Sequence, residues 1–330
     1  MGLLELPLPV QAEIKSALGL EELHDHAGIT GLAYLRQVDA KNYHRYFALP
    51  ENISWPMIKS VSVSGLATFR QPTAAELARK WLYCYDRNSS HAYAASQIKA
   101  GIGQPVARKD IEFDHLVPGF WACDIEGEAD LWAGLPLLPT HREWLPTPLL
   151  KMAQYQGCKI KVHEAYIWPD KKDRAPVFNR WANNLWQLRQ KYEKGTPERQ
   201  AIKDIMNKSV GLLRRKNGEG HKDYRPDWYS LILAEERAVV WYKAWKVWEV
   251  TELIPVGAYH DALYYAVDGP IGGLDVLKNG QPAKDSLGGY KIEWKLPMNA
   301  VVRKILTCEL NAASRIHELK KWGEENGWIK

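Results

Sequence analysis

The sequence predicts an α+β fold, and three observations support this. An aromatic, strand-like run at 81–86 (WLYCYD) leads into a segment with the composition of a helix. Residues 175–215 are rich in helix-forming side chains. Further along, the runs IPVGAYHDALYYAV and GGYKIEWKL read as β-strands, and the first of them contains a tight turn. Strands are therefore expected on both sides of a helical region.

The composition is that of a soluble globular protein. The chain has 330 residues, of which 46% are apolar and 25% are charged. No apolar run is long enough to cross a bilayer, and the N-terminus lacks the basic start and apolar core of a signal peptide. The four cysteines are scattered without a CxxC pair, so neither a structural zinc site nor a disulfide framework is expected. These features predict a cytoplasmic protein with no membrane partner.

The elements follow one another in a definite order. Before the helical region we expect helices over 8–23, 72–81 and 90–101 and strands over 58–69, 81–86, 119–127 and 159–169. Residues 175–215 should form two helices, because Thr196 can cap a new helix and Pro197 suits its first turn. A third helix over 226–248 is apolar nearly all round and should be buried. A hairpin over 254–267, a strand over 288–296 and one amphipathic helix over 299–322 complete the chain.

Charge and aromatic content favour a polyanionic partner, although each has a simpler explanation. Positive residues outnumber negative ones between Lys171 and Arg225, which is typical of a nucleic-acid-binding segment and equally of a solvated helical face. The chain has 15 tryptophans and 16 tyrosines against 5 phenylalanines. Such rings can stack on bases, or they can fill the core.

Two acidic residues stand where strands are predicted to end. Asp86 closes the run at 81–86, where it could simply cap the following helix, and Asp261 lies between aromatic residues at the hairpin. A buried carboxylate is costly unless it is paired or bound to a metal, so the two acids are candidates for sharing a pair of divalent cations. Lys203 and Asn207 lie one helical turn apart, a spacing suited to gripping a polyphosphate but also found on ordinary helix surfaces.

These segments resemble the core motifs of family B DNA polymerases, in the order found in that family. The segment DRNSSHA (86–92) resembles DxxSLYP, and KDIMNKSVG (203–211) resembles KxxxNSxYG. YHDAL (259–263) retains the second acid of YxDTDS, and LGGYKIEW (287–294) resembles a later LGxFKxE stretch. The resemblance covers roughly residues 80–300.

The resemblance implies a polymerase right hand, with an antiparallel palm sheet, helical fingers and a reduced thumb. The implied parts are an N-terminal accessory region at 1–75, palm segments at 76–170 and 226–298, fingers at 171–225 and a thumb helix at 299–330. It implies template-directed nucleotidyl transfer to a DNA strand, or primer synthesis, in phage, plasmid or mobile-element replication. The implied cofactor is two Mg²⁺ or Mn²⁺ ions, held by the catalytic residues Asp86 and Asp261.

The resemblance also assigns binding residues and partners. The implied nucleotide-binding residues are Ser89, His91, Lys203 and Asn207, together with a basic residue chosen from Lys191, Lys194 and Arg199. Those implied to bind nucleic acid are Lys208, Arg214, Arg215 and Lys291. The partners would be DNA template and primer, deoxynucleoside triphosphates and the proteins of a replication complex.

The sequence departs from the family pattern at three positions. His91 replaces a tyrosine that excludes a 2′-hydroxyl, which suggests tolerance of ribonucleotides. Val210 replaces a tyrosine near the nascent base pair, and Tyr259 replaces the first acid of the third motif. Two alternatives stay open: a polymerase-derived protein that binds nucleic acid without catalysis, and an unrelated scaffold with accidental matches.

Two further clusters of acidic and histidine residues are not expected to take part in catalysis. Asp124-Ile125-Glu126 imitates the DxE opening of a proofreading exonuclease, but in the family that domain precedes the polymerase core. We therefore interpret it as the end of a palm strand, and expect no proofreading activity. His24 and His26 flank Asp25 without a third ligand nearby, so a surface loop is expected there.

Overall fold

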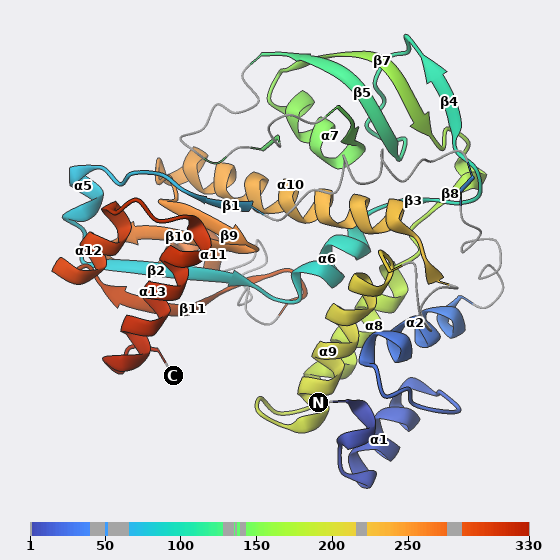
Figure 1. Cartoon of the computed structure of the whole chain (residues 1–330), viewed down its shortest axis with the longest axis horizontal. Helices are drawn as coiled ribbons and strands as arrows, with labels where there is room; N and C mark the ends of the chain where they lie inside the picture. Colours follow the sequence, from blue (N-terminus) through green and yellow to red (C-terminus); the bar gives the residue numbers. More distant parts are fainter. Residues whose placement is uncertain are drawn as a thin grey trace.

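The computed structural model describes residues 2–39, 50–51, 66–127, 135, 137–138, 143–215, 223–275 and 286–329. It confirms an α+β fold in which sheets and helical groups surround one long central helix, α10 (Figure 1). The helices of eight or more residues are α1 (Leu8–Leu18), α2 (Ala27–Val38), α6 (Ser90–Gln97), α7 (Thr147–Tyr155), α8 (Asn179–Gln190), α9 (Pro197–Leu212), α10 (Pro226–Thr251), α12 (Ala300–Thr307) and α13 (Ala312–Glu325). The shorter ones are η1 (Leu3–Glu5), α5 (Ala74–Leu77), η2 (Lys171–Asp173) and α11 (Gly272–Asp275).

A five-stranded antiparallel sheet carries the two predicted acids. Its strand order is β1-β9-β10-β2-β11. The strands are β1 (Leu66–Phe69), β2 (Trp81–Arg87), β9 (Gly257–His260), β10 (Ala262–Val267) and β11 (Tyr290–Pro297). Residues from three distant parts of the chain therefore meet in one sheet, and β2 lies between the hairpin strand β10 and β11.

Both faces of this sheet are covered by helices. Successive side chains of a strand point to opposite faces, so each strand contributes to both packed cores. Tyr83 and Tyr85 of β2 pack in a core with α10, whereas Leu82 and Cys84 pack with α12 and α13. The helix α10 is buried along most of its length, as its sequence predicted. The sheet is thus fixed between α10 on one side and the C-terminal helices on the other (Figure 1).

A second antiparallel sheet packs beyond α10. Its order is β4-β7-β5-β6, and α7 covers it on the side facing α10 (Figure 1). The strands are β4 (Val106–Lys109), β5 (Gly119–Glu126), β6 (Leu145–Pro146) and β7 (Lys159–Ile167). Short strands β3 (Ala100–Gly101) and β8 (Arg174–Ala175) pair with each other beside it.

This arrangement bears on two of the expected boundaries, because strands from each side of them pair in sheets. Residues 76–170 do not form one part of one sheet: they supply β2 to the five-stranded sheet and then build the four-stranded one. Residues 66–69 form β1, which pairs with β9 and so belongs to the five-stranded sheet. Both differences arise from long-range strand pairing, which local sequence patterns do not encode. The rest of the strand expected over 58–69 lies outside the described residues.

A helical group made of α1, α2, α8 and α9 forms the third part of the molecule (Figure 1). The break between α8 and α9 is where the sequence predicted it, and the Thr196 hydroxyl accepts a hydrogen bond from the Arg199 amide. Helices α2 and α9 pack closely: a Cβ on Gly28 would lie 2.7 Å from the Lys208 carbonyl oxygen. The glycine therefore permits this close approach.

The C-terminal region forms two helices, although one was expected over 299–322. The side chains of Asn299 and Asn311 each accept hydrogen bonds from backbone amides of a following helix, so each starts a helix of its own. Cys308 has an extended backbone between them. The helices expected over 72–81 and 90–101 are also shorter, ending at Leu77 and Gln97.

A bulge in β11 interrupts the alternation that a regular strand would give to Tyr290, Ile292 and Trp294. The pairing with β2 shifts register between Ile292 and Trp294. Tyr290 then packs on the α10 side and Trp294 on the side of the C-terminal helices, while Ile292 is 38% exposed. The extra residue, Glu293, is directed into a cavity at the end of the sheet.

Candidate active site

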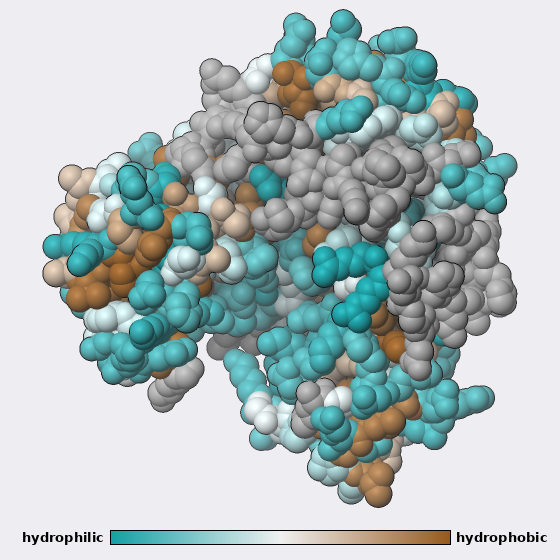
Figure 2. All heavy atoms as spheres, viewed as in Figure 1, coloured by the Kyte–Doolittle hydropathy of each residue, from teal (hydrophilic) through white to brown (hydrophobic). Residues whose placement is uncertain are grey.

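A cavity of about 430 Å³, hereafter the sheet-end cavity, lies where the five-stranded sheet meets α6, α8, α9 and α10. Figure 2 shows hydrophilic atoms in the recess between the sheet, on the left, and the helical group below. Seven of the residues predicted from the sequence line the cavity: Asp86, Ser89, His91, Lys203, Asn207, Asp261 and Lys291. Segments separated by more than a hundred residues in the chain are thus brought together there.

Asp86 reaches the cavity from the end of β2. It follows Leu82 and Cys84 on the same face of the strand, but the cover of C-terminal helices does not extend to it, and it is only partly buried. Lys291 lies directly opposite on β11, and its ammonium donates to the Asp86 carboxylate at 2.6 Å. This ion pair holds the carboxylate at the mouth of the cavity.

Asp261 enters the cavity from a tight hairpin. Because Tyr259 pairs with Ala262, only His260 and Asp261 form the loop, and His260 adopts a left-handed φ of 54°. Strand β10 lies beside β2, so the hairpin loop is next to the end of that strand. Burial, and then the charges of Asp86 and Glu236, raise the pKa of Asp261 to about 7. The two predicted acids are therefore close enough to repel each other.

Lys203 and Asn207 reach the cavity from α9. They lie one turn apart on one face of the helix, as expected from their spacing. The opposite face carries Ile205 and Ser209 against α2, so the orientation of α9 is fixed by packing. Lys203 is exposed, which leaves its ammonium accessible from the cavity.

Arg189 is a cavity residue that the sequence analysis missed. Its guanidinium donates to the Ser89 hydroxyl at 2.9 Å, and Ser89 adopts a left-handed φ of 48° at the start of α6. Burial, and then the charge of Arg199, lower the pKa of Arg189, while Asp86 raises it. A signal was available, since Arg189 follows buried Ala182 and Leu185 at helical spacing and so belongs to the inward face of α8.

The three basic residues that the resemblance offered for nucleotide binding lie outside the cavity. Among the described residues, Lys191, Lys194 and Arg199 are not part of the cavity lining. Arg199 donates to the backbone carbonyls of Arg189 and Tyr192 at 3.0 and 2.7 Å, so it satisfies the end of α8. Lys191 and Lys194 are exposed beyond that end.

Glu236 is the second cavity residue that the sequence analysis missed. It is buried on α10, and it bonds the His91 imidazole at 2.9 Å. Burial opposes ionisation of both groups, but the hydrogen bond and opposite charge of the partner outweigh it, so the pKa of Glu236 is lowered and that of His91 is raised. An acidic residue within an almost wholly apolar helix was the available signal, because it requires a partner.

This pair predicts a pH-dependent contribution to stability. The contribution of Glu236 is present above its ordinary pKa of 4.5, and that of His91 is complete below its ordinary pKa of 6.5 and is lost as pH rises through the raised value. The free-energy difference of unfolding between the wild type and His91→Gln should therefore be largest between pH 4.5 and 6.5. Urea titrations across this range measure it, and a difference that is constant up to pH 9 contradicts it. In a Glu236→Gln background the extra stabilisation below pH 6.5 should be lost, because the partner that outweighs burial is gone.

Three of the four predicted nucleic-acid contacts lie away from the cavity. Lys208 pairs with Asp204 at 2.9 Å, and the Arg214 guanidinium lies over the Tyr229 ring at 5.4 Å. Neither of these two residues lines the cavity, and Arg215 does not line it either, so only Lys291 is placed with the acids. Val210 is buried in the helical core, which removes it from any contact with a base pair.

The other two clusters have structural partners. Asp124 lies near the end of β5 in the four-stranded sheet, and it pairs with His163 at 2.9 Å. His26 accepts a hydrogen bond from the Gly28 amide and caps α2, and Asp25 accepts from the Leu4 amide. Neither cluster contributes to the sheet-end cavity.

The acids can serve a metal only together with other ligands. Within the described ranges, no group of three or more His, Cys, Asp or Glu side chains is arranged to hold a metal ion. Mg²⁺, however, is ordinarily held in proteins by one or two carboxylates together with waters and substrate phosphates. Asp86 and Asp261, partly buried and mutually repelling, fit that second kind of site.

The fold is similar to that of solved phi29 DNA polymerase structures. The complex with primer-template DNA and incoming nucleotides matches with a TM-score of 0.59 and 10% identity, over 86% of this chain and 54% of the polymerase. The complexes with primer-template DNA and with single-stranded DNA match with TM-scores of 0.56 and 0.55 and identities of 13% and 12%. The chain has a DNA polymerase-like fold.

This similarity is found between the three-dimensional structures and not between the sequences. No protein-family model matches the sequence, and no curated protein gives a significant match to it. The chain spans about half the length of the polymerases that it resembles. Among the helices that the structure describes, none has the length and apolar character required to cross a membrane.

Proposed function

We propose that this chain extends a DNA strand by template-directed nucleotidyl transfer, with two divalent cations held at Asp86 and Asp261. The observation that carries the proposal is the sheet-end cavity, where the acids lie with Lys203 and Asn207 of α9. Magnesium or manganese bound there would activate the primer hydroxyl and stabilise the leaving pyrophosphate. The polymerase-like fold supports the assignment of a palm to the five-stranded sheet and of fingers to the helical group.

The basic residues of the helical group have a defined task in this proposal. Lys203 and Asn207 offer an ammonium and an amide to a triphosphate, and Arg189 adds a guanidinium from α8. Catalysis of phosphoryl transfer consists mainly of positioning and charge neutralisation, which such donors supply. The ion pair with Lys291 orients the Asp86 carboxylate until nucleotide and cations enter.

Primer extension tests the proposal directly. The wild type should lengthen a labelled primer on a DNA template with Mg²⁺ or Mn²⁺ and deoxynucleoside triphosphates. DNA binding that weakens steeply with salt, without any synthesis under these conditions, would instead support a nucleic-acid-binding protein that has lost catalysis. The replaced motif residues Val210 and Tyr259 are what favours that second function.

Replacing Lys203 with alanine should raise the KM for nucleotide by roughly tenfold or more, because one charge-assisted contact to the triphosphate is lost. Steady-state single-nucleotide insertion measures the effect. Lys208→Ala is the matched control: it lies on the same helix, but its ammonium pairs with Asp204 and does not line the cavity. Equal effects of the two substitutions would contradict a direct role for Lys203.

His91 provides a test of sugar selection. The hydrogen bond to Glu236 fixes the imidazole ring of His91 in the cavity. This ring is smaller and more polar than the tyrosine that stands at the matching position of the family B motif. We expect the wild type to insert ribonucleotides, and His91→Tyr to favour deoxyribonucleotides by roughly tenfold or more through steric exclusion. Insertion of both nucleotide types by both proteins measures this, and an equally strict deoxyribonucleotide preference in each contradicts it.

A further inference from the structure

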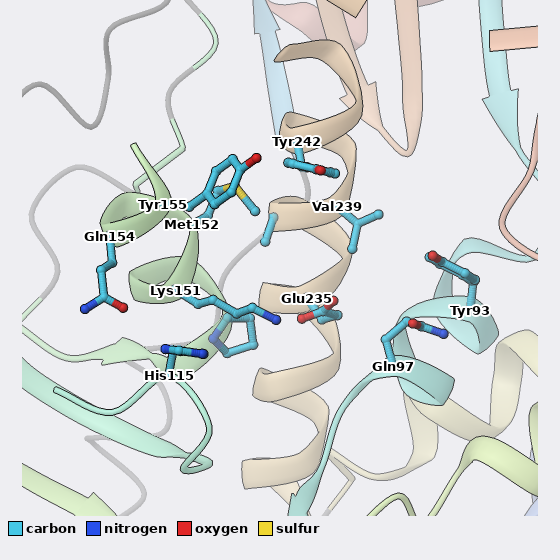
Figure 3. Close-up of a pocket in the computed structure, with 12 residues that line it drawn as sticks. Tyr93, Gln97, His115, Lys151, Met152, Gln154, Tyr155, Glu235, Val239 and Tyr242 are labelled. Carbon is cyan, nitrogen blue, oxygen red and sulfur yellow. The ribbon is translucent and has the colours of Figure 1, made fainter. Parts of the chain in front are cut away.

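A second cavity, of about 420 Å³, lies between α6, α7 and α10 (Figure 3). It is separate from the sheet-end cavity because α10 divides them: Glu236 lines the first and its neighbour Glu235 lines the second. Neither Asp86 nor Asp261 contributes to it. Its size is in the range of small-molecule binding sites.

The polar groups of this α6–α10 cavity are few and face one another. Glu235 is partly buried on the α10 wall, and burial raises its pKa against the opposing charges of Lys151 and Arg87. Lys151 extends from α7 toward Glu235, with His115 beside it (Figure 3). An acceptor pair and a cationic donor are thus presented side by side.

The remaining walls are apolar and aromatic. Rings of Tyr93, Tyr155 and Tyr242 come from the three different helices, and Met152 and Val239 lie between them (Figure 3). Tyr155 is 53% exposed, so the cavity opens to solvent at that ring. Tyrosine rings offer faces and edges against which a planar ring system can pack.

From these observations we propose that the α6–α10 cavity binds a guanine base. The Watson–Crick edge of guanine offers two neighbouring N–H donors, which match the carboxylate of Glu235, and a carbonyl oxygen, which matches the ammonium of Lys151. Adenine presents an acceptor where guanine presents its ring N–H, so it leaves the carboxylate without a donor. Cytosine and thymine offer less surface to the tyrosine rings.

The surroundings of the cavity suit the phosphate of a nucleotide. A smaller adjoining cavity of about 140 Å³ shares Lys151 and Glu235 with the first and adds Lys99. At the open side, the Lys246 ammonium lies 4.8 Å from the centre of the Trp245 ring and 5.6 Å from that of Tyr242. The guanine can therefore belong to a free nucleotide or to an unpaired position in a nucleic-acid strand.

Isothermal titration of the whole chain with dGMP and dAMP, in buffer containing EDTA, tests the proposal. The wild type should bind dGMP about tenfold or more tightly than dAMP, and Glu235→Gln should lose this preference because an amide supplies only one acceptor. Glu252→Gln is the matched control, since Glu252 is an exposed glutamate at the end of the same helix. dIMP, which lacks the second donor, should bind the wild type more weakly than dGMP, and this comparison requires no variant.

A second arm separates the two sources of guanine. An oligothymidine with one central guanine is compared with oligothymidine alone by fluorescence anisotropy. Tighter binding of dGMP than of dAMP identifies a free nucleotide as the ligand. If only the guanine-containing oligonucleotide binds more tightly than its control, the ligand is an unpaired base in a strand. Equal binding of guanine and control ligands in both arms, or a preference that survives in Glu235→Gln, overturns the proposal.

The proposal stands apart from the polymerase function. Asp86→Ala should keep the guanine preference, because Asp86 lies in the other cavity. A wild type that fails to extend a primer but prefers dGMP refutes the proposed synthesis alone. Normal synthesis without any preference for guanine refutes the second site alone.

Discussion

Replacing Asp261 with asparagine should lower primer extension by about a thousandfold or more, while making the folded chain more stable in metal-free buffer at pH 8. The loss of activity is expected because one of two carboxylates that would hold the cations is gone, and a metal contribution of several kcal/mol corresponds to such a factor. The gain in stability has a separate cause. The pKa of Asp261 is raised to about 7, first by burial and then by Asp86 and Glu236, so its ionised form is unfavourable in the folded state.

The sign of the stability effect follows from proton binding. Between pH 3.8 and about 7 the folded chain holds the proton of Asp261 more tightly than the unfolded chain, so rising pH removes stability. Asparagine carries no charge and escapes this loss. A merely structural aspartate that is replaced by asparagine would instead lower stability, so the combination of lost activity and gained stability separates the two roles.

Thermal unfolding with and without Mg²⁺ measures the same carboxylate independently of activity. Mg²⁺ should raise the Tm of the wild type and have little effect on Asp261→Asn, since a ligand stabilises only the form that binds it. Asp124→Asn is the control, because Asp124 pairs with an exposed histidine on the other sheet. Full activity in Asp261→Asn, or an equal Mg²⁺ response in both proteins, contradicts the role assigned to Asp261.

The sequence predicted those cavity-lining residues that local patterns mark, and it missed those whose place in the cavity depends on a distant partner. Asp86 and Asp261 could be found because each interrupts an apolar strand or hairpin, and Lys203 and Asn207 because their spacing defines one helix face. Arg189 and Glu236 were missed because they matter through Ser89 and His91, which lie far away in the chain.

Fold-level differences have the same origin. The bulge at Glu293 inserts one residue into β11 and redirects the side chains that follow, and no residue in GGYKIEWKL marks it. The α6–α10 cavity joins Gln97, Lys151 and Glu235 from three helices whose packing no local pattern fixes. Conversely, the Thr196-Pro197 helix start was predicted correctly, because capping depends on neighbouring backbone groups alone.

Replacing Asp227 with alanine should destabilise the chain by about 3–5 kcal/mol, the cost of removing one partner from a buried ion pair. Asp227 and Arg225 are both fully buried, and the guanidinium donates to the two carboxylate oxygens at 2.9 and 2.6 Å. The same guanidinium donates to the Gly101 carbonyl at 2.8 Å and lies 3.8 Å from the centre of the Trp228 ring. Without Asp227, the buried guanidinium loses the carboxylate that accepts two of its hydrogen bonds.

Denaturant unfolding followed by tryptophan fluorescence measures this loss, and Asp204→Ala is the matched control. Asp204 pairs with Lys208 at the surface, so its replacement should cost no more than about 1 kcal/mol. Similar effects of the two substitutions would contradict the assignment of a structural role to the buried pair.

The consequence of this pair extends to the sheet-end cavity. The Arg225 guanidinium donates to the Gly101 carbonyl of β3, and its backbone amide donates to the Leu213 carbonyl just past α9. It therefore ties the end of α9 to the start of α10, which carries Glu236 into the cavity. Loosening this junction should displace Lys203 relative to Asp86, so Asp227→Ala should lose primer extension at a temperature below that at which its sheet unfolds.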